Sequence, residues 1–264
     1  MKEEFFSGEK LYGDDFNVSK IKEWYNDEKE GYSGIVKKRI KKYSYQFHEF
    51  NKKYGFSKLN NITKFPRVLG FGAAYGDEFL PIINKIKQVY IVEPSDKLRA
   101  KKIGDKTPVY VKSSIQGKLP FENNYFDLIT CLGVIHHVPN VSFVFSELVR
   151  VLNKGGYLLI REPTVSMGDW NKPRHGLTKR ERGIPLGIMH ELIKSNGLEI
   201  VAENRILFPL TRRLAGNTEG TNSKLLVFLD GLMSRLFSWN KKYHARRIID
   251  KLQPQSVYLV LRKK

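Results

Sequence analysis

The sequence predicts an α/β fold built on one mostly parallel sheet, and three observations carry this prediction. From residue 64 onward, short runs rich in Val, Ile and Leu alternate with segments of helical periodicity, which is typical of consecutive βαβ units. A glycine-rich turn, 70–76, follows the first apolar run. Two further β-rich runs lie near the end of the chain, so we expect seven strands that finish in an antiparallel hairpin.

The elements of this sheet follow one another in regular order. We expect strands at 67–72, 89–94, 108–114, 126–133, 157–163, 198–208 and 256–263. The expected helices, two of which end near glycines, are 77–86, 95–104, 141–153 and 184–197. The fold class is therefore a Rossmann-like, seven-stranded, mostly parallel sheet with helices on both faces and a C-terminal antiparallel β-hairpin.

Two regions are expected to be additions to one core domain. Residues 1–62 form an N-terminal helical extension or lid, and residues 63–264 form the main domain, with a partly helical insertion at about 209–255. A helix of the extension has an apolar face that we expect to pack on the core, at Ile35, Ile40, Tyr43, Phe47 and Phe50. A basic amphipathic helix also suits a membrane surface, so peripheral membrane contact is left open.

Composition favours a globular protein of the cytoplasm. Of 264 residues, 41% are hydrophobic, and no apolar run approaches the roughly 18 residues that cross a bilayer. The single cysteine, Cys131, excludes a disulfide framework and a cysteine-based metal cluster. The formal charge of +19 attracts polyanions such as nucleic acid, anionic membranes or phosphorylated small molecules. Because the lysines are spread along the whole chain, the same charge also fits a plain solvated surface.

The turn at 70–76 indicates a site where the backbone approaches a ligand closely. Small residues at 70, 72, 74 and 76 leave room, and the start of the next helix offers N–H groups. In the glycine pattern of nicotinamide enzymes, the third glycine position would be Tyr75, which is too bulky there. Glu93 ends the second strand, 21 residues after Gly72, where a carboxylate can accept hydrogen bonds from both hydroxyls of a ribose.

Several blocks between residues 66 and 163 resemble the class I S-adenosylmethionine-dependent methyltransferases, of the type 11 kind. The blocks are VLGFGAAYG, IVEPS, LPFENNYFDLITCLGVIHHVPN and LNKGGYLLIREP. This resemblance implies S-adenosyl-L-methionine as the cofactor. It implies cofactor binding by Gly70, Gly72, Ala74, Gly76, Glu93, Pro94, Ser113, Ser114, Leu132 and Gly133.

The glycine motif departs from the family pattern at two positions. The family usually begins the motif with an acidic residue, where this chain has Gly70, and its second glycine is Ala74 here. The missing carboxylate removes a usual partner of the methionine amino group. Asp77, another residue or a water would then take that role, or cofactor affinity would be weaker.

Candidate catalytic residues follow the fourth strand and lie in a later loop. His136, His137 and His175 are candidates for a general base, because a neutral imidazole can accept a hydroxyl proton near neutral pH. The alternative is a structural role in which the paired histidines bind backbone groups. A metal site from His136, His137 and Glu162 is possible on residue types, but adjacent histidines point in different directions and spacing fixes no third ligand, so we expect no metal.

The loop between Asp169 and Gly183 is basic and aromatic, which favours an anionic acceptor that carries phosphate. A solvated basic loop that covers the site is the other interpretation. The candidate substrate-binding residues are Glu162, Asp169, Trp170, Arg174, Arg180 and Arg182. The text REPTVSMGDWNKPRHGLTKRERGIP also resembles bacterial methyltransferases of surface-polysaccharide synthesis, which implies O-methylation of a sugar on a nucleotide diphosphate or a lipid-linked glycan.

Two other functions remain open from the sequence. An RNA or DNA methyltransferase has the net charge in its favour, but the segment after the fourth strand reads LGVI, where base amino-methylases carry Asn-Pro-Pro-Tyr or a similar motif. A non-catalytic binding protein with the same fold is the second alternative, because Gly70 replaces the usual acidic residue.

Overall fold

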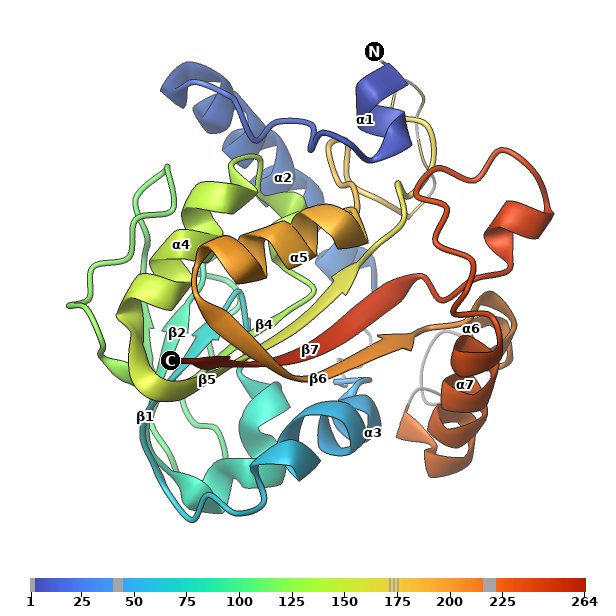
Figure 1. Cartoon of the computed structure of the whole chain (residues 1–264). Helices are drawn as coiled ribbons and strands as arrows, with labels where there is room; N and C mark the ends of the chain where they lie inside the picture. Colours follow the sequence, from blue (N-terminus) through green and yellow to red (C-terminus); the bar gives the residue numbers. More distant parts are fainter. Residues whose placement is uncertain (1–2, 40–44, 171, 173, 175, 216–221) are drawn as a thin grey trace.

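The protein is built around one seven-stranded sheet (Figure 1). The computed structural model describes residues 3–39, 45–170, 172, 174, 176–215 and 222–264, without the side chains of residues 29–39. The strands are β1 Phe65–Phe71, β2 Ile86–Val92, β3 Val109–Val111, β4 Phe126–Leu132, β5 Leu152–Pro163, β6 Leu198–Ile206 and β7 Ser256–Lys263. Their order in the sheet is β3-β2-β1-β4-β5-β7-β6.

The strand directions confirm the predicted fold class. The first five strands along the chain form only parallel pairs with one another, whereas β7 runs antiparallel to both β5 and β6. β1 and β4 are almost entirely buried because helices cover both faces, which explains their continuous apolar sequences. The parallel arrangement brings the carboxyl ends of β1, β2 and β4 together at one edge of the sheet.

Helices and helical turns cover the two faces of this sheet. The α-helices are α1 Glu3–Ser7, α2 Val18–Arg39, α3 His48–Phe50, α4 Val141–Val151, α5 Leu186–Ser195, α6 Pro209–Leu214 and α7 Lys224–Leu236. Phe145 of α4 and Met189 of α5 belong to the core on one face, while Phe79 and Val227 belong to the core on the other. In Figure 1, α4 and α5 accordingly lie on the opposite side of the sheet from α3. No described helix is long and apolar enough to cross a membrane.

Two of the predicted helices have a different form. The segment Asp77–Lys85 is a 3-10 helix that contains Pro81, a residue without a backbone donor. The helix predicted at 95–104 is wrong, because the chain there makes turns and a short bridge between Ile103 and Lys106. The N–H of Ala100 donates to the Tyr110 hydroxyl at 2.8 Å instead of to a helical carbonyl, so a tertiary contact overrides the local pattern.

The N-terminal extension contains several helical pieces. α2 ends at Arg39, and residues 45–47 are not helical, so the predicted apolar face does not belong to one continuous helix. Phe50 is buried in the core and Phe47 packs against it, as expected. The positions of Ile40 and Tyr43, and the side chain of Ile35, lie outside the described part of the chain.

The insertion between β6 and β7 contains α6, α7 and a turn at Ile249–Lys251. β7 returns from it and enters the sheet between β5 and β6, where it pairs along its length with both neighbours. The predicted antiparallel pair of C-terminal strands is therefore confirmed, although a long connection joins them.

Candidate active site

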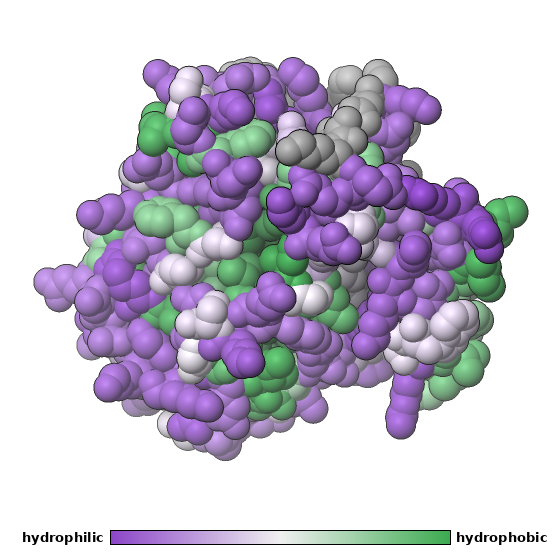
Figure 2. All heavy atoms as spheres, turned by 45° about the horizontal axis from the view of Figure 1, so that its top comes forward, coloured by the Kyte–Doolittle hydropathy of each residue, from purple (hydrophilic) through white to green (hydrophobic). Residues whose placement is uncertain are grey.

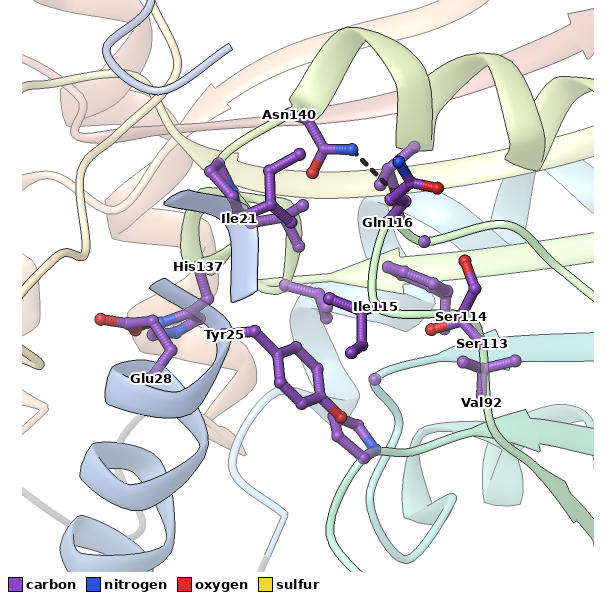
Figure 3. A pocket seen from close by; sticks show the side chains of 18 of the residues that line it. Ile21, Tyr25, Glu28, Val92, Ser113, Ser114, Ile115, Gln116, His137 and Asn140 are labelled. Carbon is purple, nitrogen blue, oxygen red and sulfur yellow. Dashed lines mark hydrogen bonds and ion pairs between the residues drawn. The ribbon is translucent and has the colours of Figure 1, made fainter. Parts of the chain in front are cut away.

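A pocket lies where the carboxyl ends of β1, β2 and β4 meet, with α2 on its outer side (Figure 3). This is the edge at which open α/β sheets bind ligands. Three groups of residues line it: the ends of the strands with their loops, the loop after β3, and one face of α2. They include Gly72, Glu93, Pro94, Ser113, Ser114, Gly133 and His137, which the sequence predicted as site residues.

Gly72 is the glycine of the turn that borders the pocket. Its φ is +67°, and its N–H donates to the carbonyl of Val92 at 2.8 Å, which ties the ends of β1 and β2 together. A Cβ at this position would lie 2.5 Å from a methyl carbon of Val134. Both its backbone conformation and its surroundings therefore require glycine.

The other small residues of the turn serve its packing. A Cβ on Gly70 would lie 2.5 Å from the Cβ of Ala73, and one on Gly76 would lie 2.2 Å from Ile103. Gly70, Ala74 and Gly76 are absent from the pocket lining, and so is Leu132. An acidic side chain at position 70 has no room in this turn.

Glu93 lines the pocket at the end of β2. Its carboxylate accepts hydrogen bonds from the N–H groups of Ala74, at 3.2 Å, and Ser95, at 3.0 Å. Burial raises its pKa, while these two N–H groups act in the opposite direction. The two backbone bonds hold the carboxylate in place and leave further lone pairs on its oxygens.

A carboxyl group does lie beside Gly70, although it comes from a different position. Thr130 of β4 is the register partner of Gly70, and its hydroxyl donates a short hydrogen bond to the carboxyl of Glu78. Burial raises the pKa of Glu78 to about 7, against the effects of Thr130 and Arg161. Glu78 thus places a carboxyl group against the residue of β4 that is paired with the start of the glycine turn.

The loop after β3 and the start of α4 form another wall. The side-chain amide of Asn140 donates to the carbonyl of Gln116 at 2.8 Å, as Figure 3 shows. The Oδ1 atom of Asn140 is buried and has no partner, although the residue lines the pocket. An unpaired buried acceptor is costly, and a bound donor would remove that cost.

The sequence interpretation missed the contribution of α2. Ile21, Tyr25 and Glu28 of this helix line the pocket, and in Figure 3 the ring of Tyr25 extends from α2 into it. Trp24 is fully buried and its indole N–H donates to the carbonyl of His137 at 2.8 Å. The signal was present, because residues 21, 24, 25 and 28 share one face of a helix.

The two adjacent histidines have different surroundings. His137 lines the pocket, and its Nδ1 lies 2.8 Å from a carboxylate oxygen of Glu28. His136 is buried, with Nδ1 2.6 Å from Glu162 and Nε2 3.4 Å from Glu181. Burial by itself lowers the pKa of His136, but the two carboxylates outweigh it and raise this pKa to about 9. His136 is therefore protonated at neutral pH and lacks the lone pair that a general base needs.

Glu162 binds the backbone of the turn that follows β4. One of its oxygens accepts from the N–H groups of Val134, at 2.7 Å, and Ile135, at 3.1 Å, while the other faces His136. The residue is fully buried and does not line the pocket. Its observed contacts shape the turn that carries His137.

The arginines of the loop at 164–185 bind protein groups. Arg182 is fully buried and donates to the carbonyls of Tyr12, His136 and Pro139. Arg174 donates to four carbonyls within its own loop. Arg180 pairs with Asp27 and Glu23 of α2. Arg180 and Arg182 thus fasten the loop to the N-terminal segment, and Arg174 holds the loop together, while acceptor binding by these arginines stays a prediction.

The remaining predicted residues lie away from the pocket lining. Trp170 stacks on Phe6 and Tyr12, and its indole N–H donates to the carbonyl of Ser166 at 2.7 Å. Asp169 forms an ion pair of 3.7 Å with Lys172. The third candidate base, residue 175, lies outside the described residues.

One group among the described residues has the composition of a metal site. His136, His137 and Glu181 bring ligand atoms to within 4.8 Å of one another. Both ring nitrogens of His136 already face carboxylates, and a proton satisfies that arrangement as well as a metal would. We therefore assign no metal to this group.

Comparison with known proteins places this site in a family context. Residues 69–160 match the family model described as a methyltransferase domain. The ubiquinone/menaquinone biosynthesis C-methyltransferase of Shewanella pealeana is 30% identical over 124 residues, which cover 43% of this chain and 46% of that protein. The phthiotriol/phenolphthiotriol dimycocerosates methyltransferase 1 of Mycobacterium ulcerans is 30% identical over 136 residues, 49% of each chain. This chain thus spans about half the length of the curated relatives it matches.

Solved structures share the fold. An S-adenosylmethionine-dependent methyltransferase from Mesorhizobium loti superposes with a TM-score of 0.53 at 17% identity, covering 79% of this chain and 95% of that one. The YcgJ protein of Bacillus subtilis gives 0.52 at 18% identity, covering 80% and 97%. The matched domain implies S-adenosylmethionine as the cosubstrate. Residues 69–160 therefore resemble a methyltransferase domain, and the chain has the fold of solved S-adenosylmethionine-dependent methyltransferases.

Proposed function

We propose that this protein transfers a methyl group from S-adenosylmethionine to a hydroxyl group, with the cofactor in the pocket between α2 and the carboxyl ends of β1 and β2. The observation that carries the proposal is the set of polar groups in that pocket. Glu93 presents a fixed carboxylate and Asn140 presents a buried, unpaired acceptor. A nucleoside offers both matching donors, namely ribose hydroxyls and an exocyclic amino group.

The pocket residues fit an adenosyl group in three ways. Glu93 can accept from the ribose hydroxyls through its remaining lone pairs. Asn140 lies beside the loop after β3, where its Oδ1 can accept from the adenine amino group. Gly72 provides the tight turn that borders the pocket, because its backbone conformation and the nearby Val134 leave no room for a side chain. The methionine end would extend toward Gly133, and the Glu78 carboxyl binds Thr130, the residue paired with Gly70.

When bound, S-adenosylmethionine supplies an activated methyl group on a positively charged sulfur. The chain then has two tasks, which are to align the acceptor and to remove its proton. Alignment in an enclosed site can supply roughly 7 to 11 kcal/mol of the barrier reduction. Tyr25 and Ile21 enclose the pocket from the side of α2.

His137 is the general base in this proposal. Glu28 holds Nδ1 of the ring, so the neutral imidazole carries its basic lone pair on Nε2. In the transfer, the hydroxyl oxygen would replace the sulfur on the methyl carbon, and the carbon–sulfur bond would break with its electron pair left on the sulfur of a neutral thioether product. The hydroxyl proton would pass to Nε2, and Glu28 would stabilise the resulting imidazolium. The protonated His136 stays fixed between Glu162 and Glu181.

For the acceptor, we favour a sugar hydroxyl on a nucleotide diphosphate or a lipid-linked glycan. The resemblance of the 161–185 segment to methyltransferases of surface-polysaccharide synthesis supports this class, and so does a base suited to hydroxyl groups. The curated relatives are named for other acceptors, so the acceptor is tested separately from the cofactor. Nucleic acid is the competing acceptor, and its binding would weaken steeply with salt.

Calorimetric titration with S-adenosylmethionine tests the core of the proposal. Wild type should bind, and Glu93→Ala should weaken binding roughly ten- to hundredfold, because it removes charged hydrogen bonds to the ribose. Glu93→Gln keeps the size of the side chain and one acceptor oxygen, for the N–H of either Ala74 or Ser95, so it separates loss of the charge from loss of the side chain. Glu122→Ala removes an exposed carboxylate and serves as the matched control. Absence of binding by wild type at millimolar cofactor would overturn the proposal and favour a non-catalytic protein.

A further inference from the structure

Helix α7, Lys224–Leu236, packs on the protein through a face that mixes apolar and polar residues. Its buried residues are Val227, Asp230 and Ser234. The carboxylate of Asp230 accepts hydrogen bonds from the N–H groups of Leu207, at 2.9 Å, and Phe208, at 2.8 Å. In an ordinary surface helix the apolar stripe faces the core and the polar residues face water. α7 departs from this arrangement, because its buried positions include Asp230 and Ser234 while a second set of apolar residues faces outward.

The apolar residues of α7 lie on its outer side. They recur at intervals of three and four residues, which places them on one stripe, and just after the helix Trp239 continues it. Their exposed fractions are 66% for Leu225, 59% for Phe228, 56% for Leu232, 64% for Leu236 and 66% for Trp239. Figure 2 shows hydrophobic residues along the right-hand edge of the molecule, the side on which α7 lies in Figure 1. Scattered exposed apolar side chains are ordinary, but a continuous stripe marks a contact surface.

The helix cannot turn this stripe inward. Gly231 packs so closely on the hydroxyl of Tyr54 that a Cβ there would come within 2.5 Å of it. Asp230 fixes the same face through its backbone partners at Leu207 and Phe208. Rotation of α7 would break these contacts and leave the buried Asp230 carboxylate without its two backbone donors. The exposure of the stripe is therefore part of the folded structure.

The exposed charges in the α6 and α7 region are basic and favour a negatively charged partner for the stripe. In the described residues between 209 and 242 the only carboxylate is that of Asp230, which is buried. Leu210 and Leu214 of α6 add further exposed apolar side chains. The exposed basic residues of this region are Arg212, Arg213, Lys224, Arg235, Lys241 and Lys242. A second copy of this chain would bring like charges together, whereas a negatively charged lipid surface complements both the bases and the apolar stripe.

We propose that the outer face of α7, with the adjoining end of α6, docks on an anionic lipid bilayer. The leucines and Phe228 enter the boundary between headgroups and acyl chains. Trp239 lies at the headgroup level, which suits an amphipathic indole. The basic side chains bind the lipid phosphates. This inference goes beyond methyl transfer and does not depend on it.

Co-sedimentation with vesicles tests the docking face. The vesicles contain phosphatidylglycerol and phosphatidylcholine in equal parts, or phosphatidylcholine alone. The test variant is Phe228→Ser/Leu232→Ser, and the matched control is Phe143→Ser, which changes a phenylalanine 44% exposed on α4. Wild type and the control should bind the anionic vesicles, with weaker binding at high salt. The double variant should bind roughly tenfold or more weakly, because two apolar side chains no longer insert.

The double variant also separates the competing explanations. Since the chain carries a net charge of +19, charge by itself attracts it to anionic vesicles. Equal binding by the double variant and the control would therefore overturn the proposal. Failure of wild type to bind the anionic vesicles would overturn it too, as would a dimer in analytical ultracentrifugation that the double variant dissociates. Unchanged melting temperature and cofactor affinity, measured without vesicles, establish that the double variant is folded and keep this test independent of the proposed function.

Discussion

Glu28 and His137 are 109 residues apart in the chain, yet a carboxylate oxygen of Glu28 lies 2.8 Å from Nδ1 of His137. The contact joins α2 of the N-terminal extension to the turn after β4. The same carboxylate accepts from the Thr178 hydroxyl at 2.6 Å and from the N–H of Arg180 at 3.0 Å. One residue of the extension thus connects the pocket, the histidine turn and the loop at 164–185.

Removing the base should affect turnover more than cofactor binding. We expect His137→Ala to lower kcat about 10²- to 10⁴-fold, the usual contribution of a general base. Glu28→Gln should lower kcat by a smaller factor, because the amide oxygen still accepts from Nδ1 but no longer stabilises an imidazolium. Steady-state kinetics with a hydroxyl acceptor, together with calorimetry for the cofactor, measures both effects.

The control for Glu28 is its neighbour Asp27. Asp27→Asn loosens the same loop, because Asp27 pairs with Lys179 and Arg180, but it does not touch His137. Equal losses of kcat in Asp27→Asn and Glu28→Gln would assign Glu28 a role in the loop and not in positioning the base.

Tyr25 should contribute to cofactor affinity through its ring. Tyr25→Ala removes an aromatic wall of the pocket and is expected to weaken S-adenosylmethionine binding about tenfold. Tyr25→Phe keeps the ring and should bind nearly as wild type does. Calorimetry on the two variants distinguishes enclosure by the ring from a hydrogen bond of the hydroxyl, since the latter would make both variants equally weak.

Asn140 should act on the adenine end of the cofactor. Asn140→Leu has a similar volume but lacks the acceptor Oδ1, so we expect cofactor affinity to fall roughly tenfold. A cofactor analogue without the exocyclic amino group should bind wild type more weakly than the natural cofactor does. Wild type and the leucine variant should bind this analogue with equal affinity. If the leucine variant still binds the natural cofactor more tightly than the analogue, the adenine amino group does not contact Asn140.

Glu78 should make stability fall as pH rises. Its pKa is about 7 in the folded protein, above its ordinary value of 4.5, so between these values the folded state keeps a proton that the unfolded chain has lost. The unfolding free energy therefore decreases from pH 4.5 to 7, by roughly 1.4 kcal/mol per unit of pKa shift, and the loss is complete above pH 7.

Glu78→Gln does not titrate and should lack this component. Melting temperatures of wild type and variant, followed by calorimetry from acidic to neutral pH, should diverge as pH rises, to the advantage of the variant. Parallel curves would show that Glu78 keeps an ordinary pKa in the folded protein.

Metal chelation should leave activity unchanged. The two ring nitrogens of His136 face Glu162 and Glu181, so a protonated imidazole can fill both contacts without a metal ion in the His136, His137 and Glu181 group. Initial rates after dialysis against EDTA should equal those of untreated protein. A loss that zinc restores would reassign this group as a metal site.

The glycine turn shows which features of the site a local sequence pattern can predict. Its residues predicted a ligand site at the end of β1, and Gly72 and Glu93 do line the pocket. The pattern did not show that Gly70 and Gly76 serve packing, because that depends on Ala73 and Ile103, whose positions come from the folded turn. The arginines of the 164–185 loop illustrate the same limit, since their carbonyl partners belong partly to distant segments.

Local patterns in the sequence predicted the sheet, its mostly parallel order and the edge at which the pocket lies, because periodicity and turn residues are local properties. The folded structure was needed to show that α2 closes the pocket and that Glu28 contacts His137. The same is true of the contact between Glu78 and Thr130, and of the apolar stripe that α7 exposes. Each of these depends on how one element is rotated against another, and packing between distant segments sets that rotation.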